Sequence, residues 1–214
     1  MTAEQEKRLA AEAAAEFVQD GMRVGLGTGS TVAYLLPALA RRKLSIRCVA
    51  TSPRTELRAA ELGLSVQPFD TLDALDICID GADQIAPDGW LIKGGGGAHT
   101  REKIVAAAAT QFIVIADSSK PVPALHPPVP LELLRFGLPS TLRRLGPVTL
   151  RDVPPSPDGG VIADYHGPVG DPAALADRLS RTPGVVAHGL FEPALVSVIL
   201  IDHGETLEQR TYPA

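Results

Sequence analysis

The sequence has few cysteines and no long apolar run. Only two cysteines, Cys48 and Cys78, occur in 214 residues, and each lies inside an apolar, strand-like segment. We therefore expect both to be buried core residues rather than redox-active or metal-binding groups. No apolar run approaches the roughly 20 residues that span a bilayer, and residues 1–6 are acidic and polar, unlike a secretory signal. These absences predict a cytoplasmic protein without a membrane partner.

Positive charge is also scarce. The chain has 20 Lys and Arg against 25 Asp and Glu, a formal net charge of −5, and its basic residues are not clustered. Because a nucleic-acid surface needs a basic stripe, we expect no nucleic-acid partner. An anionic small molecule would instead need local positive charge at its site. The hydrophobic content of 45% is ordinary for a globular chain with a core, and the length suits one main domain with a smaller appendage.

Strand-like and helix-like segments alternate through the first 120 residues. An amphipathic helix is predicted over residues 3–19, and Pro37 interrupts an apolar segment at 32–39, where we expect a kink or an early end. The other main predicted elements are strands at 23–26, 46–50, 75–79 and 112–116 and helices at 55–62 and 100–109. This alternation predicts an α/β fold with a mostly parallel sheet and helices on both faces.

The pattern changes after Lys120. Five prolines crowd residues 121–130, which we interpret as a linker or domain edge. A small α+β unit is predicted beyond it, from strands at 148–150, 161–164 and 185–191 and a helix at 172–181, and the strand-like residues 196–201 are expected to return to the main sheet. The predicted domains are a main α/β domain of residues 1–126 plus 195–214 and a small α+β domain of residues 127–194.

Lys93 precedes four consecutive glycines, which lead into the predicted helix that carries Glu102. Glycine lets main-chain N–H groups approach a ligand closely, and a helix N-terminus behind such a loop favours anions. Lys93 adds a positive charge, and Glu102 supplies a base within ten residues of it. The stretch predicts a proton-transfer site. The alternative is a glycine hinge beside a solvated glutamate.

A second glycine-containing turn, Gly27-Thr28-Gly29-Ser30-Thr31, follows the first predicted strand and precedes an apolar helix-like segment. It is not a dinucleotide fingerprint, because Ser30 replaces the third glycine, and it lacks the Gly-Lys of a Walker loop. Its three hydroxyl groups beside a helix start suit a single phosphate or sugar hydroxyls. The alternative is that Ser30 or Thr31 merely caps the helix.

Two more polar clusters follow predicted strands: Asp80-Gly81-Ala82-Asp83 and Asp117-Ser118-Ser119-Lys120. In open α/β sheets the ligand crevice lies beyond the carboxyl ends of the strands, so the first two aspartates form a candidate acid/base pair. One alternative is a metal site, for which no His or Cys stands at a suitable spacing. The other is a plain turn with structural aspartates.

In this order and spacing, the clusters at 27–31, 80–83, 93–96, 100–103 and 117–120 closely resemble ribose-5-phosphate isomerase, type A. The resemblance runs through most of the chain and includes residues 183–186 and 189–191. It implies an aldose–ketose isomerase of the non-oxidative pentose phosphate pathway, which interconverts D-ribose 5-phosphate and D-ribulose 5-phosphate without metal or organic cofactor. It also implies a doubly wound, Rossmann-like main domain, a smaller ferredoxin-like domain and a homodimer or homotetramer.

The resemblance assigns roles by position. Glu102 matches the family's catalytic base, and Asp80, Asp83 and Lys93 match its other active-site residues. Lys7 matches a basic residue near the phosphate. Further substrate-binding positions are matched by Thr28, Gly29, Ser30, Thr31, Gly81, Ala82, Gly94, Gly95, Gly96 and Lys120.

The chain departs from the family pattern at a few positions. Gly97 and His99 stand where the family often has alanine and an apolar residue, Gln84 replaces a common acid, and residues 154–160 and 192–196 are atypical. None of these touches the four catalytic matches, and a role for His99 as a second base is disfavoured because the catalytic set is already complete.

Two other functions remain as alternatives. A sugar-phosphate-binding regulatory module need not keep a base, a lysine and paired acids together, and it usually carries a DNA-binding helix-turn-helix, which the single N-terminal helix does not provide. An acyl-CoA transferase-like enzyme would use Glu102 as a nucleophile, but the sequence has no obvious long surface for coenzyme A.

Overall fold

The computed structural model describes residues 1–212, which form two compact units. The large unit comprises Met1–Ala82, Arg101–Lys120 and the C-terminal segment from Ala194, and the small unit comprises Asp83–Thr100 and Pro121–Pro193. Residues 83–100 thus belong to the small unit, whereas the predicted main domain included them. The division into functional domains of residues 1–126 plus 195–214 and 127–194 stays a prediction.

The large unit is built on a seven-stranded sheet with the order β14-β13-β7-β4-β1-β2-β3. All neighbours are parallel except the edge strand β14, which is antiparallel to β13. The bounds are β1 (Arg23–Leu26), β2 (Arg47–Ala50), β3 (Ser65–Val66), β4 (Leu75–Gly81), β7 (Ala109–Asp117), β13 (Val198–Asp202) and β14 (Leu207–Thr211). A short 3-10 turn, Phe69–Thr71, precedes β4. The strand order reverses between β1 and β4, which is where ligands bind in doubly wound sheets.

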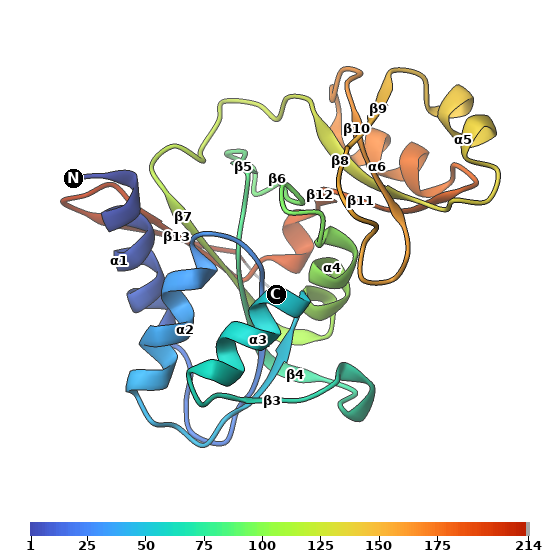
Figure 1. Cartoon of the computed structure of the whole chain (residues 1–214). Helices are drawn as coiled ribbons and strands as arrows, with labels where there is room; N and C mark the ends of the chain where they lie inside the picture. Colours follow the sequence, from blue (N-terminus) through green and yellow to red (C-terminus); the bar gives the residue numbers. More distant parts are fainter. Residues whose placement is uncertain (213–214) are drawn as a thin grey trace. The chain divides into compact units, whose positions relative to one another are not determined.

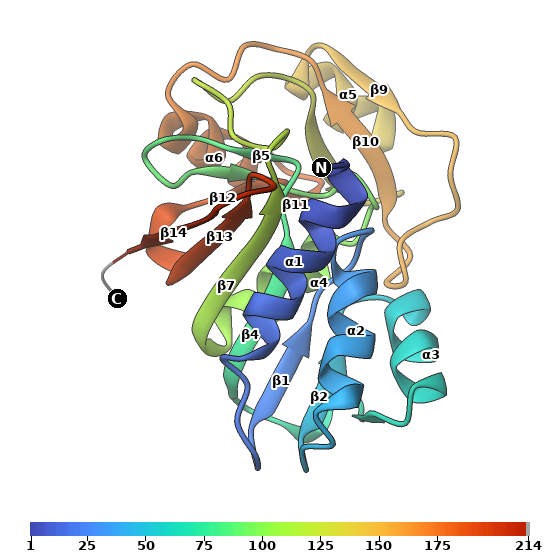
Figure 2. The same ribbon diagram turned by 90° about the vertical axis from the view of Figure 1, so that its left-hand side faces the viewer.

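Helices cover both faces of this sheet. The bounds are α1 (Ala3–Ala15), α2 (Val32–Arg41), α3 (Pro53–Glu61) and α4 (His99–Ala107). Helices α1 and α2 lie side by side on one face (Figure 2), and their small and aliphatic side chains share a core with Val24 and Leu26 of β1. Gly25 lies between Val24 and Leu26 in the strand and faces the opposite side of the sheet, because a Cβ placed on Gly25 would overlap Val105 of α4. Side chains alternate across a strand, so α4 covers the opposite face.

Two predicted helix ends differ from the structure. Helix α1 ends at Ala15 rather than near residue 19, with Glu16 as its C-cap and a turn before Gly21, which has φ of +82°. The expected early end near Pro37 was wrong, because α2 continues through Pro37 to Arg41; the alternative, a kink at Pro37, stays a prediction. Burial of Leu35, Leu36 and Leu39 against the sheet offsets the hydrogen bond that the proline removes.

The small unit contains a four-stranded antiparallel sheet with two helices (Figure 1). Its elements are β8 (Val129–Leu133), α5 (Leu138–Leu145), β9 (Val148–Leu150), β10 (Val161–Tyr165), α6 (Pro172–Ser180) and β11 (Val185–His188). The spatial order of the strands is β11-β8-β10-β9. Along the chain, α5 follows the first strand, β8, and α6 follows the third, β10, which is the ferredoxin-like arrangement. A three-stranded sheet of β5 (Gln84–Ile85), β6 (Leu91–Ile92) and β12 (Leu190–Phe191) completes the unit, and a 3-10 turn, Pro193–Leu195, follows β12.

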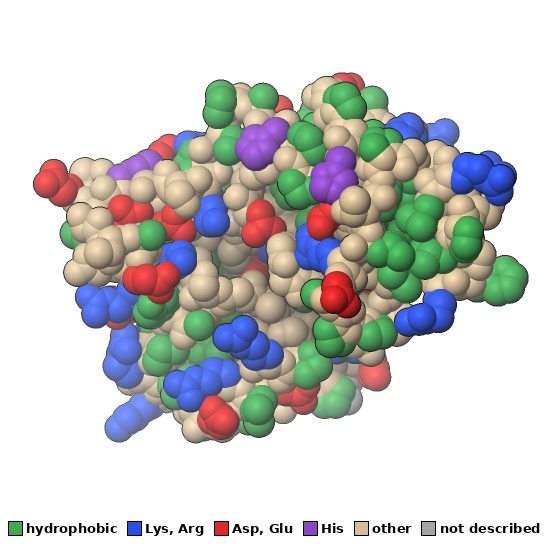
Figure 3. All heavy atoms as spheres, turned by 45° about the horizontal axis from the view of Figure 1, so that its top comes forward, with side chains coloured by type: hydrophobic (Ala, Val, Ile, Leu, Met, Phe, Trp, Pro, Cys, Tyr) green, Lys and Arg blue, Asp and Glu red, His purple; other side chains and the backbone are tan. Residues whose placement is uncertain are grey.

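The predicted fold class, a doubly wound α/β sheet with a smaller α+β unit, is confirmed. Residues 198–202 do return to the main sheet, parallel to β7. Strand β8 begins inside the segment interpreted as a linker, and α5 and β14 were not predicted. Cys48 and Cys78 are buried in the core, as expected. Among residues 1–212 no helix combines the length and apolarity that crossing a bilayer requires. Basic and acidic side chains are interspersed on the face in Figure 3.

Candidate active site

Asp80 lies at the carboxyl end of β4 and is held by main-chain donors of the large unit. Its Oδ1 accepts hydrogen bonds from the N–H of Thr28 (3.0 Å) and the N–H of Gly81 (2.7 Å), and the residue is 1% exposed. A Cβ placed on Gly27 would overlap the Asp80 carboxyl group. Gly27 therefore serves the close approach of a carboxylate rather than a phosphate, a use that the sequence did not predict. Two N–H donors thus hold the Asp80 carboxyl group at the point where the strand order reverses.

The hydroxyl of Thr28 belongs to a cluster of four hydroxyl groups at the carboxyl ends of β1 and β2. Its Oγ1 lies 2.8 Å from Oγ1 of Thr51, 2.8 Å from Oγ of Ser52 and 3.3 Å from Oγ1 of Thr55. Thr55 also donates to the carbonyl of Gly27 at 3.0 Å, and Ser52 caps α3 by accepting from the N–H of Thr55. The cluster fixes the β1–α2 turn. Sequence reasoning missed it, although hydroxyl residues directly after β2 were a usable signal.

Ser30 and Thr31 start α2 without capping it. Thr31 occupies the N-cap position, but its side chain makes no capping hydrogen bond, and Ser30 is exposed. Gly29 has φ of +132°, a conformation that side chains disfavour. The alternative that Thr31 is only a helix cap therefore fails. The turn presents the positive end of the α2 dipole at the carboxyl edge of the sheet, an arrangement suited to a phosphate.

Lys7 on α1 is the first of two candidate cations in the large unit. Its Nζ lies 2.8 Å from Oε1 of Glu4, and its side chain is 15% exposed. The hydrogen bond to Glu4, helped by the negative charges of Glu4 and Asp117, holds the pKa of Lys7 above its usual value even though burial acts in the other direction. The ammonium group is therefore charged at neutral pH and held in place.

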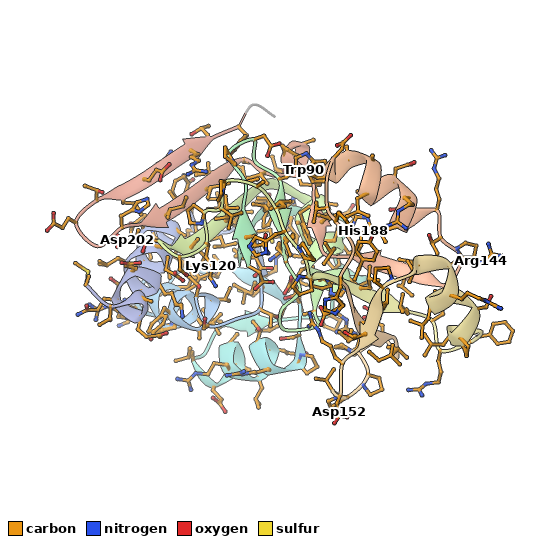
Figure 4. The ribbon with its side chains drawn as sticks, turned by 90° about the horizontal axis from the view of Figure 1, so that it is seen from above. Trp90, Lys120, Arg144, Asp152, His188 and Asp202 are labelled. Carbon is orange, nitrogen blue, oxygen red and sulfur yellow. The ribbon has the colours of Figure 1, made fainter. Side chains whose placement is uncertain are left out.

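Lys120, the second candidate cation, lies in a turn after β7 that is tied to α1 (Figure 4). The N–H and hydroxyl of Ser118 donate to Oε2 of Glu6 at 2.9 and 2.7 Å. Asp117 accepts from the N–H and hydroxyl of Ser119, and its carbonyl accepts from the N–H of Lys120 at 3.2 Å. The Ser118 bonds hold the pKa of Glu6 below its usual value. Sequence reasoning did not find Glu6, because its partner is 112 residues away.

Glu102 lies in the first turn of α4, directly behind the glycine loop, and is 4% exposed. A carboxylate is favourable at this end of a helix. Strand β7 begins two residues after α4 ends and runs from the amino to the carboxyl edge, so α4 has its N-terminal end toward the carboxyl edge. The large unit thus places Glu102 toward the edge that also carries Thr28, Asp80 and Lys120.

In the small unit, Asp83 and the glycine loop hold each other. Oδ2 of Asp83 accepts from the N–H of Gly95 at 2.8 Å, and the N–H of Gly97 donates to the carbonyl of Gly94 at 3.0 Å. Gly94 has φ of +106°, and a Cβ on Gly94 would lie 2.7 Å from Nδ1 of His99. Asp83 thus pairs with a loop 12 residues away, which is not the behaviour of a simple turn aspartate.

Lys93 is fixed at both ends within the small unit. Its N–H donates to the carbonyl of Gly189 at 2.8 Å, and its Nζ lies 5.4 Å from the ring centroid of Phe191 on β12. The residue is 2% exposed, and an ammonium over an aromatic face in a shielded place gains electrostatic stabilisation. Lys93 is therefore a preorganised cation rather than a solvated surface lysine.

The predicted site residues fall into two sets. The large unit holds Lys7, Thr28–Thr31, Asp80, Gly81, Ala82, Glu102 and Lys120, and the small unit holds Asp83, Lys93 and Gly94–Gly96. Sequence reasoning missed Arg151, whose guanidinium donates to the carbonyls of Gly94 (2.9 Å) and Gly95 (3.0 Å). Within residues 1–212 no three His, Cys, Asp or Glu side chains are grouped so as to hold a metal ion.

Comparison with known proteins gives consistent matches. The family model for ribose 5-phosphate isomerase A (phosphoriboisomerase A) matches residues 47–205. The ribose-5-phosphate isomerase A of Caulobacter sp. (strain K31) is 45% identical over 206 residues, covering 89% of this chain and 91% of the relative.

Solved structures of ribose 5-phosphate isomerases also match this chain. The ribose 5 phosphate isomerase A of Neisseria gonorrhoeae has a TM-score of 0.93 at 34% identity and covers 100% of this chain and 98% of its own. A D-ribose-5-phosphate isomerase in complex with phospho-erythronic acid has a TM-score of 0.93 at 33% identity, with 99% and 100% covered. The family model and relatives of this identity, over most of the length, show that the chain belongs to the ribose 5-phosphate isomerase A family.

Proposed function

We propose that this protein is an aldose–ketose isomerase that interconverts D-ribose 5-phosphate and D-ribulose 5-phosphate in the non-oxidative pentose phosphate pathway. The observation that carries the proposal is the 45% identity to a ribose-5-phosphate isomerase A across 89% of the chain. Both alternatives, a regulatory sugar-phosphate module and an acyl-CoA transferase, are less well supported by this membership. We further propose a cytoplasmic homodimer or homotetramer with no metal or organic cofactor.

The reaction moves a proton between C2 and C1 of the open-chain sugar. In our proposal the carboxylate of Glu102 removes the C2 proton of ribose 5-phosphate and returns it to C1, and an enediolate forms between the two steps. A positioned base is typically worth about 10²–10⁴-fold in rate. Burial of Glu102 supports the role, because a general base must be held in a fixed position rather than move freely in solvent.

The developing oxyanion needs donors as well as a base. Lys93 supplies a buried, fixed positive charge. The N–H groups of Gly95 and Gly97 already donate within the small unit, so we assign the N–H of Gly96 as a donor to the enediolate, with that of Gly94 as a second. One well-aimed donor of this kind is worth about 2.7–4 kcal/mol. Either Asp80 or Asp83 transfers protons between sugar oxygens, including during ring opening.

The phosphate is proposed to bind at the β1–α2 turn. The amino end of α2, with Gly29, Ser30 and Thr31, and the ammonium groups of Lys7 and Lys120 supply the positive potential there. Binding the unreactive phosphate orients the sugar and contributes energy that lowers the barrier at the reacting carbons.

A direct test follows the conversion of ribose 5-phosphate to ribulose 5-phosphate, with and without a chelator. A preparation from the same host without the gene controls for contaminating isomerase. We expect turnover in proportion to added protein and no effect of the chelator. Binding of the sugar phosphate without turnover would favour the regulatory module, and acyl transfer from coenzyme A would favour the transferase. Either result would contradict the proposal.

A further inference from the structure

Arg151 follows β9 and joins β10 to the glycine loop within the small unit. Its Nε and Nη2 donate to Oδ2 and Oδ1 of Asp164 at 2.8 and 2.7 Å, and its Nη1 donates to the carbonyls of Gly94 and Gly95 at 2.9 and 3.0 Å. The side chains of Arg151 and Asp164 are 18% and 17% exposed, so water screens this pair only in part. All three guanidinium nitrogens are therefore used, with fixed directions.

This arrangement suits a guanidinium and no other side chain. A planar fork binds a carboxylate on one side and still aims a donor at two carbonyls, whereas an ammonium group lacks this geometry. The glycine loop needs such restraint, because glycine loses more conformational freedom on ordering than any other residue. Asp83 restrains the loop from its N–H side and Arg151 from its carbonyl side.

The contacts also polarise the loop. The carbonyl of Gly95 shares a peptide group with the N–H of Gly96, and the carbonyl of Gly94 shares one with the N–H of Gly95. A positive charge on a carbonyl oxygen strengthens the donor at the other end of the same peptide, because chained hydrogen bonds polarise one another. The N–H of Gly95 donates to Asp83. The N–H of Gly96 is the donor that we assign to the substrate.

We propose that Arg151, oriented by Asp164, is a positioning residue for the isomerisation. It fixes and polarises the peptide between Gly95 and Gly96 so that the N–H of Gly96 points to the oxygen that becomes negative in the enediolate. This inference deepens the proposed function and rests on it. Arg151 itself need not touch the substrate, so its effect falls on the transition state rather than on ground-state binding.

The test compares Arg151→Met, Arg151→Lys and Asp164→Asn with the parent protein. We expect Arg151→Met to lower kcat about 10–100-fold, as misplacement of a reacting group does, with KM for ribose 5-phosphate changed by less than about threefold. Binding of phospho-erythronic acid, whose planar carboxylate resembles the enediolate in shape and charge, should weaken by a similar factor to kcat. Arg151→Lys should recover little of the lost kcat, and the kcat of Asp164→Asn should lie between those of the parent and Arg151→Met.

Arg144→Met is the matched control, because Arg144 is an exposed arginine on α5 of the same unit (Figure 4). It should leave kcat and KM unchanged. Added guanidinium ion should raise the kcat of Arg151→Ala and not that of the parent. A folded Arg151→Met with parental kcat, a full rescue by lysine, or a rise in KM with unchanged kcat would each overturn the inference.

A readout that does not need activity separates this inference from the proposed function. Amide hydrogen exchange at residues 94–97 should be faster in Arg151→Met than in the parent or in Arg144→Met, because the loop loses two restraints. If the parent protein does not isomerise ribose 5-phosphate, the proposed function fails whatever the exchange rates. If the parent is active and the loop exchanges equally in all variants, only the role of Arg151 fails.

Discussion

The carboxyl group of Asp80 packs directly on the Cα of Gly27, so no larger residue fits at position 27. At the residue scale, contacts of this kind define both sets of site residues. Main-chain N–H groups hold Asp80 in the large unit and Asp83 in the small unit, and an aromatic ring and a carbonyl hold Lys93. Positions of single atoms, rather than residue types alone, thus decide whether these groups can act.

Gly27→Ala should damage the reaction more than the fold. The added methyl displaces the Asp80 carboxylate, so we expect kcat/KM to fall at least about 100-fold, as expected for a misplaced group. Overpacking should lower the free energy of unfolding by about 1–3 kcal/mol. Steady-state kinetics and urea unfolding measure the two effects. Unchanged kinetics in the folded variant would show that Asp80 is not needed in its observed position.

The sequence carries stronger signals for the candidate site residues than for their partners. Glu102, Asp80, Asp83 and Lys93 were singled out because glycine loops and strand ends leave local signals, and their roles stay predictions. The contacts of Asp80 with Thr28 and of Glu6 with Ser118 span 52 and 112 residues, and those of Arg151 with the glycine loop span 56 to 57 residues, so no local pattern records them. Gly27 was recognised as special, but its physical reason, the approach of Asp80, needed the fold.

At the scale of elements, Ser52 connects a helix cap to the candidate phosphate turn. Its Oγ accepts from the N–H of Thr55 at 3.2 Å to cap α3 and accepts from the hydroxyl of Thr28 at 2.8 Å. A helix end and a binding turn therefore share one hydroxyl group. Removing it should affect stability and substrate binding together.

Ser52→Ala should lower the free energy of unfolding by about 1 kcal/mol, the usual cost of a lost cap, and should raise KM because the β1–α2 turn loosens. Asp171→Ala is the control, since Asp171 caps α6 by accepting from the N–H of Ala173 at 3.0 Å. It should cost similar stability and leave KM unchanged. If Ser52→Ala and Asp171→Ala have equal KM values, Ser52 does not support the β1–α2 turn and the prediction is wrong.

The contact between α1 and the turn after β7 should make stability depend on acid pH. The Ser118 bonds lower the pKa of Glu6 below its ordinary value of 4.5, with burial and the charge of Asp117 acting in the opposite direction. The stability from this contact is therefore present above pH 4.5 and is lost as the pH falls through the lowered pKa.

Ser118→Ala should remove that part of the dependence. Urea unfolding at pH 7 should show the variant to be less stable than the parent, and the difference should shrink as the pH falls below 4.5. A difference that stays constant with pH would mean that Ser118 acts by packing rather than through the Glu6 carboxylate.

At the scale of the whole molecule, the order of elements was more predictable than their boundaries. Alternating strands and helices predicted the parallel sheet, because strongly apolar segments report burial directly. Strand β8 was hidden by Pro128 and Pro130, and β14 by its polar, alternately exposed residues at an edge. Helix α5 is short and begins behind Gly137, which has φ of +68° and gives no capping side chain.

The buried core also predicts behaviour at high pH. Burial raises the pKa of the Cys48 thiol from 9.0 to about 12. Since the folded pKa is the higher one, the contribution of Cys48 to stability is full below pH 9.0 and is lost as the pH rises toward 12. In the folded protein at pH 8, both thiols should resist a thiol-specific reagent, and both should react in urea. Fast labelling of the native protein would contradict the buried assignment.

The central claim is that the carboxylate of Glu102 transfers the proton between C2 and C1. The most direct test measures kcat for ribose 5-phosphate in Glu102→Gln, with Glu56→Gln on the exposed side of α3 as the matched control. Loss of the base should lower kcat by at least about 10²–10⁴-fold, while the dissociation constant of ribose 5-phosphate stays within a few fold and Glu56→Gln behaves as the parent. A near-parental kcat in a folded Glu102→Gln variant would contradict the account.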